Sequence, residues 1–331
     1  MSPNLCRQLL AALTLVLAAA TTSAEPYLAV RAGAPCAACH VNPTGGGLRT
    51  AFGTAYGIDS LPAEAVAGAA EWTGSVGNRL RVGGDLRANL SVVDVPNRDE
   101  EYAFGRDEAL LYAEFVLLPE RLSFYVDQRV APGTAVNREA YALLRSPERN
   151  WHLKAGRLFA PYGLRLEDDS AYIRQFTGIS MANSDDGIEV GWQRGPGAVQ
   201  LAVTNGNGGG AENNKGKQWS LNLTHVADAW RIGAGYNFND GVEQQDRSLS
   251  NLHFGLRTGP VAWLAEADYI VDDTLPTGRR KQALGLIEAN VALARGHNVK
   301  LTFEYFDPDT KLDEDQRNRS SLVWEYTPLP F

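Results

Sequence analysis

The sequence contains little cysteine and little methionine. Its 331 residues include three cysteines and two methionines. Cys6 lies in an N-terminal stretch that we expect to be removed, so Cys36 and Cys39 make up the whole thiol content of the mature chain. A scaffold held together by several disulfides is therefore excluded. A structural zinc site needs four ligands, and no second cysteine pair is present to complete one.

The sequence also lacks a long hydrophobic run and an excess of positive charge. No apolar stretch of 18 residues follows residue 24, so no transmembrane helix is predicted. The chain has 31 basic and 39 acidic residues, a formal net charge of −8, which argues against nucleic acid as a partner. A transmembrane β-barrel is compatible with both observations. Its strands cross a bilayer with a much weaker sequence signal than that of a transmembrane helix.

The N-terminal stretch is typical of an export signal. Arg7 precedes an apolar run of 12 residues, Leu9 to Ala20, which is too short to span a bilayer. Small residues follow and end at Ala24, so we expect residues 1–24 to be a signal peptide that is cleaved after Ala24. The mature protein is therefore expected outside the cytoplasm.

Cys36, Cys39 and His40 form a C-x-x-C-H motif, which is the attachment motif for c-type haem. In this interpretation the two cysteines bind the porphyrin covalently, and His40 ligates the iron from one face. Export fits this chemistry, because covalent c-type haem attachment happens outside the cytoplasm. A thioredoxin-like redox pair needs a βαβ context that this region lacks, whereas a plain structural disulfide stays open.

The motif lies in a segment rich in small residues, which we bound at residues 25–72. A glycine-rich turn at 42–47 follows His40, and it serves either to bring the backbone close to a flat ligand or as a flexible linker. Ser60 is a candidate cap for a short helix at 61–71. A segment of this size cannot bury a haem comfortably by itself. We therefore expect another part of the chain to wrap one covalent haem c.

From residue 77 onward, hydrophobicity alternates with a period of two. Leu122, Phe124 and Val126, for example, alternate with Ser123 and Asp127, and later stretches repeat the pattern. Charges on one face of every strand cannot lie in the core of a soluble sandwich. The pattern therefore predicts a wet inner face and an apolar outer face in contact with lipid.

Counting these stretches gives 14 candidate strands. They lie at 77–92, 107–118, 120–130, 137–146, 150–160, 187–194, 197–204, 217–226, 228–239, 247–258, 260–272, 281–295, 297–306 and 317–327. Short turns alternate with long polar loops, among them 161–186, as in outer-membrane barrels with short periplasmic turns and long outer loops. An even strand count closes the sheet without an edge. The fold class expected for 73–331 is an all-β transmembrane antiparallel β-barrel of about 14 strands. The small N-terminal c-type haem segment would lie in the periplasm or within the lumen.

The combination of a signal peptide, one C-x-x-C-H segment and a β-barrel resembles the fused monohaem cytochrome c–porin family of iron-oxidising bacteria. The resemblance covers the mature chain in architecture, and its sharp motif is Cys36, Cys39 and His40. It implies an electron-transfer protein in the outer membrane of a Gram-negative bacterium, with a periplasmic c-type cytochrome or similar carrier as partner. Separately, the stretch from Gly156 to Leu164 is similar to a motif of phosphate-selective porins.

The haem segment offers no second axial ligand, since no histidine or methionine lies between Val41 and Trp72. We expect the barrel to provide one: Met181 in the long loop at 161–186 is the first choice, and His253 on a lumen-facing strand position is the second. The alternative role for Met181 is packing on the barrel wall, and for His253 it is hydrogen bonding in the lumen. An iron with an open or water-bound sixth position is a further alternative.

The long loops carry clustered carboxylates, which attract hard cations. An extracellular metal ion is therefore a candidate partner besides outer-membrane lipid, although bridging to lipopolysaccharide or plain solubility explains the same clusters. The main functional hypothesis is an outer-membrane cytochrome–porin that passes electrons between the cell surface and periplasmic carriers, with Fe(II) as a candidate donor. The alternatives are a general solute porin without a redox role and a haem enzyme acting on a small molecule.

Overall fold

The computed structural model describes residues 25–64, 74–93, 101–212, 214–241, 246–275 and 278–329. The predicted signal peptide and the expected boundary at residues 72–73 between haem segment and barrel lie outside these residues. Among the described residues, no helix is both long and apolar enough to cross a membrane.

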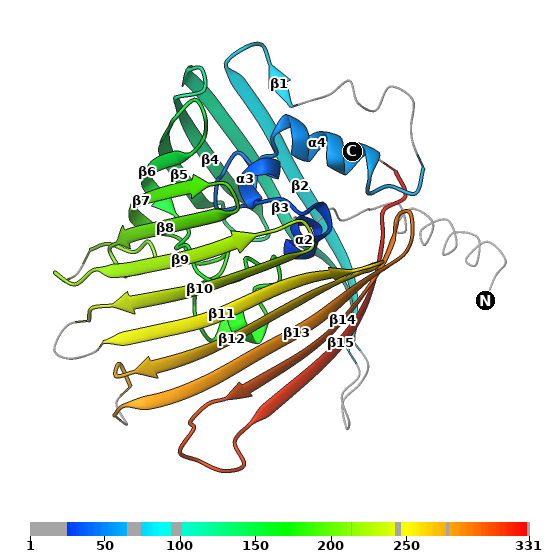
Figure 1. Cartoon of the computed structure of the whole chain (residues 1–331). Helices are drawn as coiled ribbons and strands as arrows, with labels where there is room; N and C mark the ends of the chain where they lie inside the picture. The colour runs from blue at the N-terminus through cyan, green and yellow to red at the C-terminus, as the bar shows by residue number, and fades with distance from the viewer. Residues whose placement is uncertain are drawn as a thin grey trace.

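Within the described residues, fifteen strands form one sheet, in which each strand pairs with its neighbours in the sequence (Figure 1). They are β1 (Ser75–Val76), β2 (Leu80–Val93), β3 (Glu101–Leu118), β4 (Leu122–Ala131), β5 (Val136–Arg145), β6 (Trp151–Leu158), β7 (Asp185–Arg194), β8 (Gly197–Thr204), β9 (Gln218–Val226), β10 (Trp230–Asn239), β11 (Arg247–Thr258), β12 (Val261–Asp272), β13 (Arg280–Ala294), β14 (His297–Asp307) and β15 (Arg317–Tyr326). All pairings are antiparallel, so the predicted all-β antiparallel architecture is confirmed. The 14 predicted strands correspond to β2–β15, and β1 is a two-residue addition too short for its alternation to be recognised.

The sheet is apolar on its outer face and charged on its inner face. Leu86 and Ile188 expose 74% and 53% of their surface, whereas the side chains of Glu114 and Lys154 are fully buried on the inner side. A soluble sandwich has the opposite arrangement, because removing apolar area from water is what stabilises it. The predicted separation of the two faces is therefore confirmed.

Residues 25–64, which we call the plug, lie on the concave side of the sheet (Figure 1). The plug contains α2 (Pro26–Ala32), α3 (Cys36–Cys39) and α4 (Ala51–Asp59). The Tyr27 hydroxyl of α2 donates to Glu325 on β15 at 2.8 Å. The Arg31 guanidinium donates to Asn298 on β14 at 2.6 Å. Because the turn that follows α3 is bonded to β4–β6, the plug extends between two distant parts of the sheet.

The end of the plug contacts the chain just beyond the last strand of the sheet. The Ala63 amide donates to the Thr327 carbonyl at 2.8 Å, just beyond β15, and the Val82 amide of β2 donates to the Gly74 carbonyl at 2.8 Å. The strand order ends at β1 on one side and at β15 on the other, with no ladder between them among the described residues. The predicted closure of the barrel therefore stays a prediction.

The connection between β6 and β7, at 159–184, turns inward instead of forming the outer loop that the sequence analysis expected. Its short helix α5 (Tyr172–Gln175) buries Ile173 completely. The Tyr162 hydroxyl donates to Asp268 on β12 at 2.9 Å, and Arg247 on β11 donates to the Thr177 carbonyl at 2.6 Å. Burial of apolar residues and inward-facing carboxylates fix this loop against the inner wall, which loop polarity alone could not reveal.

The helix expected at 61–71 differs from the one observed. Ser60 is the C-cap of α4, which ends at Asp59, instead of the N-cap of a later helix, and residues 65–71 lie outside the described part of the chain. Thr50 is the N-cap of α4, because its side chain accepts a hydrogen bond from the Gly53 amide at 3.1 Å.

Candidate cofactor site

The C-x-x-C-H motif forms a single helical turn followed by a tight return of the chain. Cys36 and Cys39 begin and end α3, and both are free cysteines. His40 closes the turn, with its amide donating to the Cys36 carbonyl at 3.0 Å. The Val41 amide then donates to the Leu48 carbonyl at 2.9 Å, which folds residues 41–48 back on themselves. The cysteines and His40 therefore lie together at one end of this return.

Three successive glycines make the return tight enough to pack against its surroundings. Gly45, Gly46 and Gly47 have φ values of 95°, 81° and 64°, a region that other residues rarely adopt. A Cβ atom on Gly45 would lie 3.2 Å from the Cβ of Cys36, and one on Gly47 would overlap the Tyr125 hydroxyl. The glycines bring the backbone close to Cys36 and to Tyr125 of the sheet, whereas their close approach to a flat ligand stays a prediction.

Buried polar side chains of the sheet hold the same turn. Asn42 donates to Glu139 on β5 at 2.9 Å, and Lys154 on β6 donates to the Thr44 hydroxyl at 2.9 Å. The Leu48 amide donates to the Tyr125 hydroxyl on β4 at 3.1 Å. These bonds join residues that are far apart in the sequence, so they form only when the sheet is assembled around the plug.

A cavity of about 390 Å³ lies between the motif and the inner wall of the sheet. Cys36, Cys39 and His40 line it from the plug, while residues of β6–β10 and their short turns line it from the wall, including His152 and Arg231. Its volume falls within the range of roughly 300–1,000 Å³ that is usual for ligand and cofactor sites. The cavity therefore provides what the short haem segment lacked, a second wall around the predicted cofactor.

The imidazole of His40 is neutral and has a nitrogen without a partner. Its Nδ1 atom is buried and forms no hydrogen bond with the residues that the structure describes. Burial, together with the positive charges of Arg49 and Arg165, lowers the pKa of His40 to about 4. A neutral imidazole with an open nitrogen is the form that ligates a metal.

The charge of the cavity also fits a cofactor that carries carboxylates. Its lining includes one acidic side chain, Glu25, and five arginines: Arg49, Arg145, Arg149, Arg165 and Arg231. Haem carries two propionate groups, which an arginine-rich wall can bind through charge-assisted hydrogen bonds. The thiols, the open imidazole nitrogen, the cavity size and the arginines together fit the predicted haem c.

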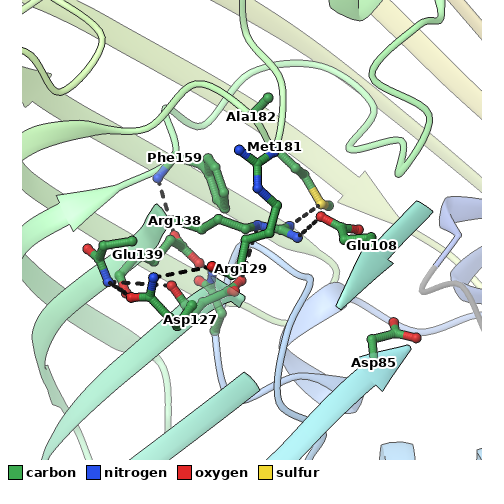
Figure 2. A network of polar contacts seen from close by, with 12 residues as sticks. Asp85, Glu108, Asp127, Arg129, Arg138, Glu139, Phe159, Met181 and Ala182 are labelled. Carbon is green, nitrogen blue, oxygen red and sulfur yellow. Dashed lines mark hydrogen bonds and ion pairs between the residues drawn. The ribbon is translucent and has the colours of Figure 1, made fainter. Parts of the chain in front are cut away.

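Met181 does not line this cavity. It lines a smaller, adjoining one, and it packs on Gly46, whose added Cβ atom would lie 3.4 Å from the methionine Cε. Figure 2 shows Arg138 directed at both Met181 and Glu108, with Arg138 Nη2 3.3 Å from the sulfur and Nη1 2.9 Å from the carboxylate. The sulfur therefore accepts a hydrogen bond from the inner wall. This agrees with the alternative role of Met181, which is packing on the barrel wall.

His253 is also outside the group of residues that line the large cavity. It faces the inside of the sheet, as predicted, and is 2% exposed. Its Nδ1 lies 3.2 Å from Asn251 Oδ1, while its Nε2 is buried and has no partner among the described residues. The structure thus brings Cys36, Cys39 and His40 together and leaves the two predicted distal ligands, Met181 and His253, elsewhere.

His152 is the inner-wall histidine that does line the large cavity. It lies on β6, is 9% exposed, and its Nε2 is 2.8 Å from Glu189 Oε1 on β7. It is not among the second ligands predicted from the sequence, which are Met181 and His253. The sequence did contain a hint of its inward direction. His152 and Lys154 are two positions apart on one strand, so their side chains lie on the same face of β6.

No family model and no curated protein matches this sequence. Among solved structures, the fold is similar to an anion-selective porin from Comamonas acidovorans, with a TM-score of 0.58 and 13% identity over 74% of this chain and 83% of that chain. It is also similar to OmpT of Vibrio cholerae, with a TM-score of 0.53 and 13% identity over 76% of this chain and 84% of that chain.

A third similar structure is the outer-membrane channel DcaP of Acinetobacter baumannii, with a TM-score of 0.53 and 11% identity over 76% of this chain and 88% of that chain. Identities this low establish the fold alone. The resemblance to fused cytochrome–porins stays a prediction, and the sheet of this chain has the fold of outer-membrane porins.

Proposed function

We propose that this protein is an outer-membrane β-barrel that carries one haem c on its plug and passes electrons between the cell surface and periplasmic carriers. The cavity at the C-x-x-C-H motif is the observation that carries this proposal. Its size, its thiols and its arginine-rich lining agree with one haem, and it is walled jointly by the plug and the sheet.

The outer face of the sheet supports a membrane location. Six tryptophans of the described residues expose between 40% and 56% of their surface. Five lie within two residues of a strand end on the short-turn side of the sheet, Trp151, Trp192, Trp230, Trp263 and Trp324, while Trp219 lies at the opposite end, near the start of β9. Aromatic belts of this kind are found at the membrane–water interface of outer-membrane barrels. The sheet also carries an apolar band above this belt, so its outer face is suited to contact with lipid. We infer that β2 and β15 meet within the membrane and close the sheet into a barrel.

Within the plug, Cys36 and Cys39 would hold the haem covalently and His40 would ligate its iron. When bound, haem c supplies a site that accepts and releases one electron. The chain's own part is to hold the imidazole neutral, to exclude bulk water with the inner wall and to fix the motif through Asn42 and Thr44. His152 joins Met181 and His253 as a candidate for the second iron ligand.

The two ends of the proposed barrel indicate different partners for electron transfer. The large cavity is lined by residues of short turns, such as Asn150, Gly195 and Pro196, so a periplasmic c-type cytochrome or similar carrier would approach from that side. At the other end, the acidic loops would favour an extracellular metal ion, with Fe(II) as the candidate donor.

Staining for haem tests the proposal directly. The outer-membrane fraction is separated on a denaturing gel and stained for haem peroxidase activity. We expect a stained band at the mass of the mature chain, weaker staining in Cys36→Ala and Cys39→Ala, and none in the double variant. A wild-type band that never stains would refute the haem proposal.

The second candidate function is a solute porin without a redox role, which the porin-like neighbours favour. Conductance of the purified wild type in planar bilayers separates the two functions. We expect low conductance, since the plug is bonded to both sides of the inner wall. Large, stable channels in a protein without haem would support the porin instead.

A further inference from the structure

We propose that Arg231, on the inner wall at β10, binds a propionate carboxylate of the haem, so that the sheet anchors the anionic edge of a cofactor held covalently by the plug. This inference rests on the proposed haem c and deepens it by assigning a residue to the other end of the cavity. It adds a binding residue from the barrel to a motif that lies wholly in the plug.

Arg231 is a buried guanidinium without a counter-charge. Its side chain is 8% exposed, and its Nε and Nη1 atoms are buried with no hydrogen-bond partner among the described residues. Burying an ion in such surroundings is unfavourable unless an opposite charge compensates it. Arg231 also lines the large cavity, so this guanidinium borders the space where a ligand would lie.

Other buried arginines of the inner wall already have carboxylate partners. Arg138 lies 2.9 Å from Glu108, Arg145 lies 3.1 Å from Glu114, and Arg174 is paired with Glu266. Arg165 is the next most open residue in the cavity, because its Nη2 lacks a hydrogen bond, but Glu139 is only 3.8 Å away. Among the residues described, Arg231 is thus the cavity-lining guanidinium that most needs an anion.

The stem of Arg231 is fixed between the sheet and the plug. A Cβ atom added to Gly255 on β11 would lie 2.9 Å from the Cγ of Arg231 and 2.6 Å from a methyl carbon of Val30 on α2. The arginine therefore passes through a gap that Gly255 keeps open, next to the helix that precedes the C-x-x-C-H motif. Such a fixed fork loses little conformational entropy when it binds a carboxylate through two hydrogen bonds.

The occupant that fits both ends of this cavity is a haem. A free carboxylate solute would use Arg231 but would leave Cys36, Cys39 and the open His40 nitrogen without a role. A covalently held porphyrin uses the thiols and the imidazole at one edge and presents its propionates to a cationic wall at another. The inference therefore commits to a haem propionate.

The test uses the full-length holoprotein purified from the outer membrane, with three variants: Arg231→Gln, Arg231→Lys and the matched control Arg194→Gln. Arg194 is an exposed arginine at the short-turn end of β7 and does not line the cavity. The readouts are haem content per chain, the midpoint potential from optical titration, and the propionate bending mode in the resonance Raman spectrum.

We expect Arg231→Gln to lower the midpoint potential, because the loss of a nearby positive charge favours the oxidised, more positive haem. The propionate bending mode should shift in the same variant. Arg231→Lys should keep the potential close to that of the wild type, since its charge is retained, while the bending mode still shifts. Arg194→Gln should change neither readout.

Three other outcomes overturn the inference. A fully haem-loaded Arg231→Gln with an unchanged potential and bending mode shows that the propionates are bound elsewhere, while the haem proposal itself stands. A wild type without haem removes both proposals, and the stained gel detects this before any variant is made. A channel current that citrate blocks in the wild type but not in Arg231→Gln, with the haem signals unaltered, assigns the arginine to a solute carboxylate instead.

Discussion

Gly47 lies directly against the hydroxyl group of Tyr125. A Cβ atom at position 47 would overlap that oxygen, and the neighbouring Leu48 amide donates to it at 3.1 Å. Tyr125 is in turn stacked on Tyr141 with the ring centroids 5.1 Å apart, so it cannot move aside freely. This contact fixes the turn after His40 to β4 and makes a glycine necessary there.

Gly47→Ala should therefore release the turn from the wall. The new residue combines a φ of 64° with a steric overlap. Backbone strain of this kind costs about 1–3 kcal/mol, and overpacking costs a similar amount. We expect faster cleavage of residues 25–64 by an added protease, measured by mass spectrometry of the purified protein.

Gly77→Ala is the matched control for this prediction. Gly77 has a φ of 66°, yet nothing lies within 4 Å of the position of its added Cβ atom. Gly77→Ala introduces the backbone strain of a positive φ but no steric overlap. The plug of this variant should therefore be cleaved at nearly the rate of the wild type. Equal cleavage of both variants would mean that the Tyr125 contact contributes nothing to docking.

The buried pair Lys154 and Glu189 gives a second prediction. Both side chains are fully buried, their charged atoms are 3.1 Å apart, and Lys154 also donates to the Thr44 hydroxyl of the plug. Removing one member of such a pair leaves an uncompensated ion and costs about 3–5 kcal/mol. We expect Glu189→Gln to lower the urea midpoint for unfolding of the purified barrel, followed by gel mobility without heating.

A double-mutant cycle separates this electrostatic cost from lost packing. Lys154→Met combined with Glu189→Gln should destabilise the barrel less than the sum of the single changes, because no unpaired charge remains. The exposed pair Lys217–Glu212, at 2.8 Å, is the control, and Glu212→Gln should cost less than about 1 kcal/mol. Additive single effects in the buried pair would show that the two ions are not coupled.

The third prediction concerns the second iron ligand. Of the three candidates, His152 alone lines the large cavity, so His152→Ala should convert a low-spin haem spectrum to a high-spin one. Met181→Ala should leave the spectrum unchanged, and so should His225→Ala, an exposed histidine stacked on Trp230 at 5.2 Å.

Loss of a sulfur-to-iron absorption band in Met181→Ala would instead assign the ligand to Met181 and require that its sulfur leave Arg138. A wild-type haem that is high-spin and binds carbon monoxide when reduced would favour the open iron site of the haem-enzyme alternative.

Local patterns in the sequence were sufficient to predict the strands but not the docking of the plug. The alternation around Leu122 and Asp127 follows from a two-residue period, which each strand carries by itself. The contact of Asn42 with Glu139 joins residues 97 positions apart, and no local pattern encodes it. The same reason explains why the role of His152 was missed, because the cavity it lines exists only once α3 is packed inside the sheet.

The inward course of residues 159–184 was unpredictable for a related physical reason. Its acidic residues at 167–169 are typical of an outer loop, which is what its length and polarity predict. The buried Ile173 and the bond from Tyr162 to Asp268 outweigh that polarity once β11–β14 form a wall for them to pack on. The motif residues Cys36, Cys39 and His40, by contrast, are adjacent in the sequence, so their grouping needed no tertiary information.

The last prediction tests the orientation of the proposed barrel in the membrane. Asp228 lies in the short turn between β9 and β10, against which Gly33 of the plug packs, and Asp313 lies in the longer connection between β14 and β15. Both are exposed, so a cysteine at either position should be reactive. If short turns face the periplasm, Asp313→Cys should react with an impermeant maleimide on intact cells, and Asp228→Cys only after the outer membrane is opened. The native cysteines are replaced by alanine in both variants, which removes background labelling. Labelling of Asp228→Cys on intact cells would put the plug at the cell surface, and a periplasmic electron carrier could then no longer reach the cavity.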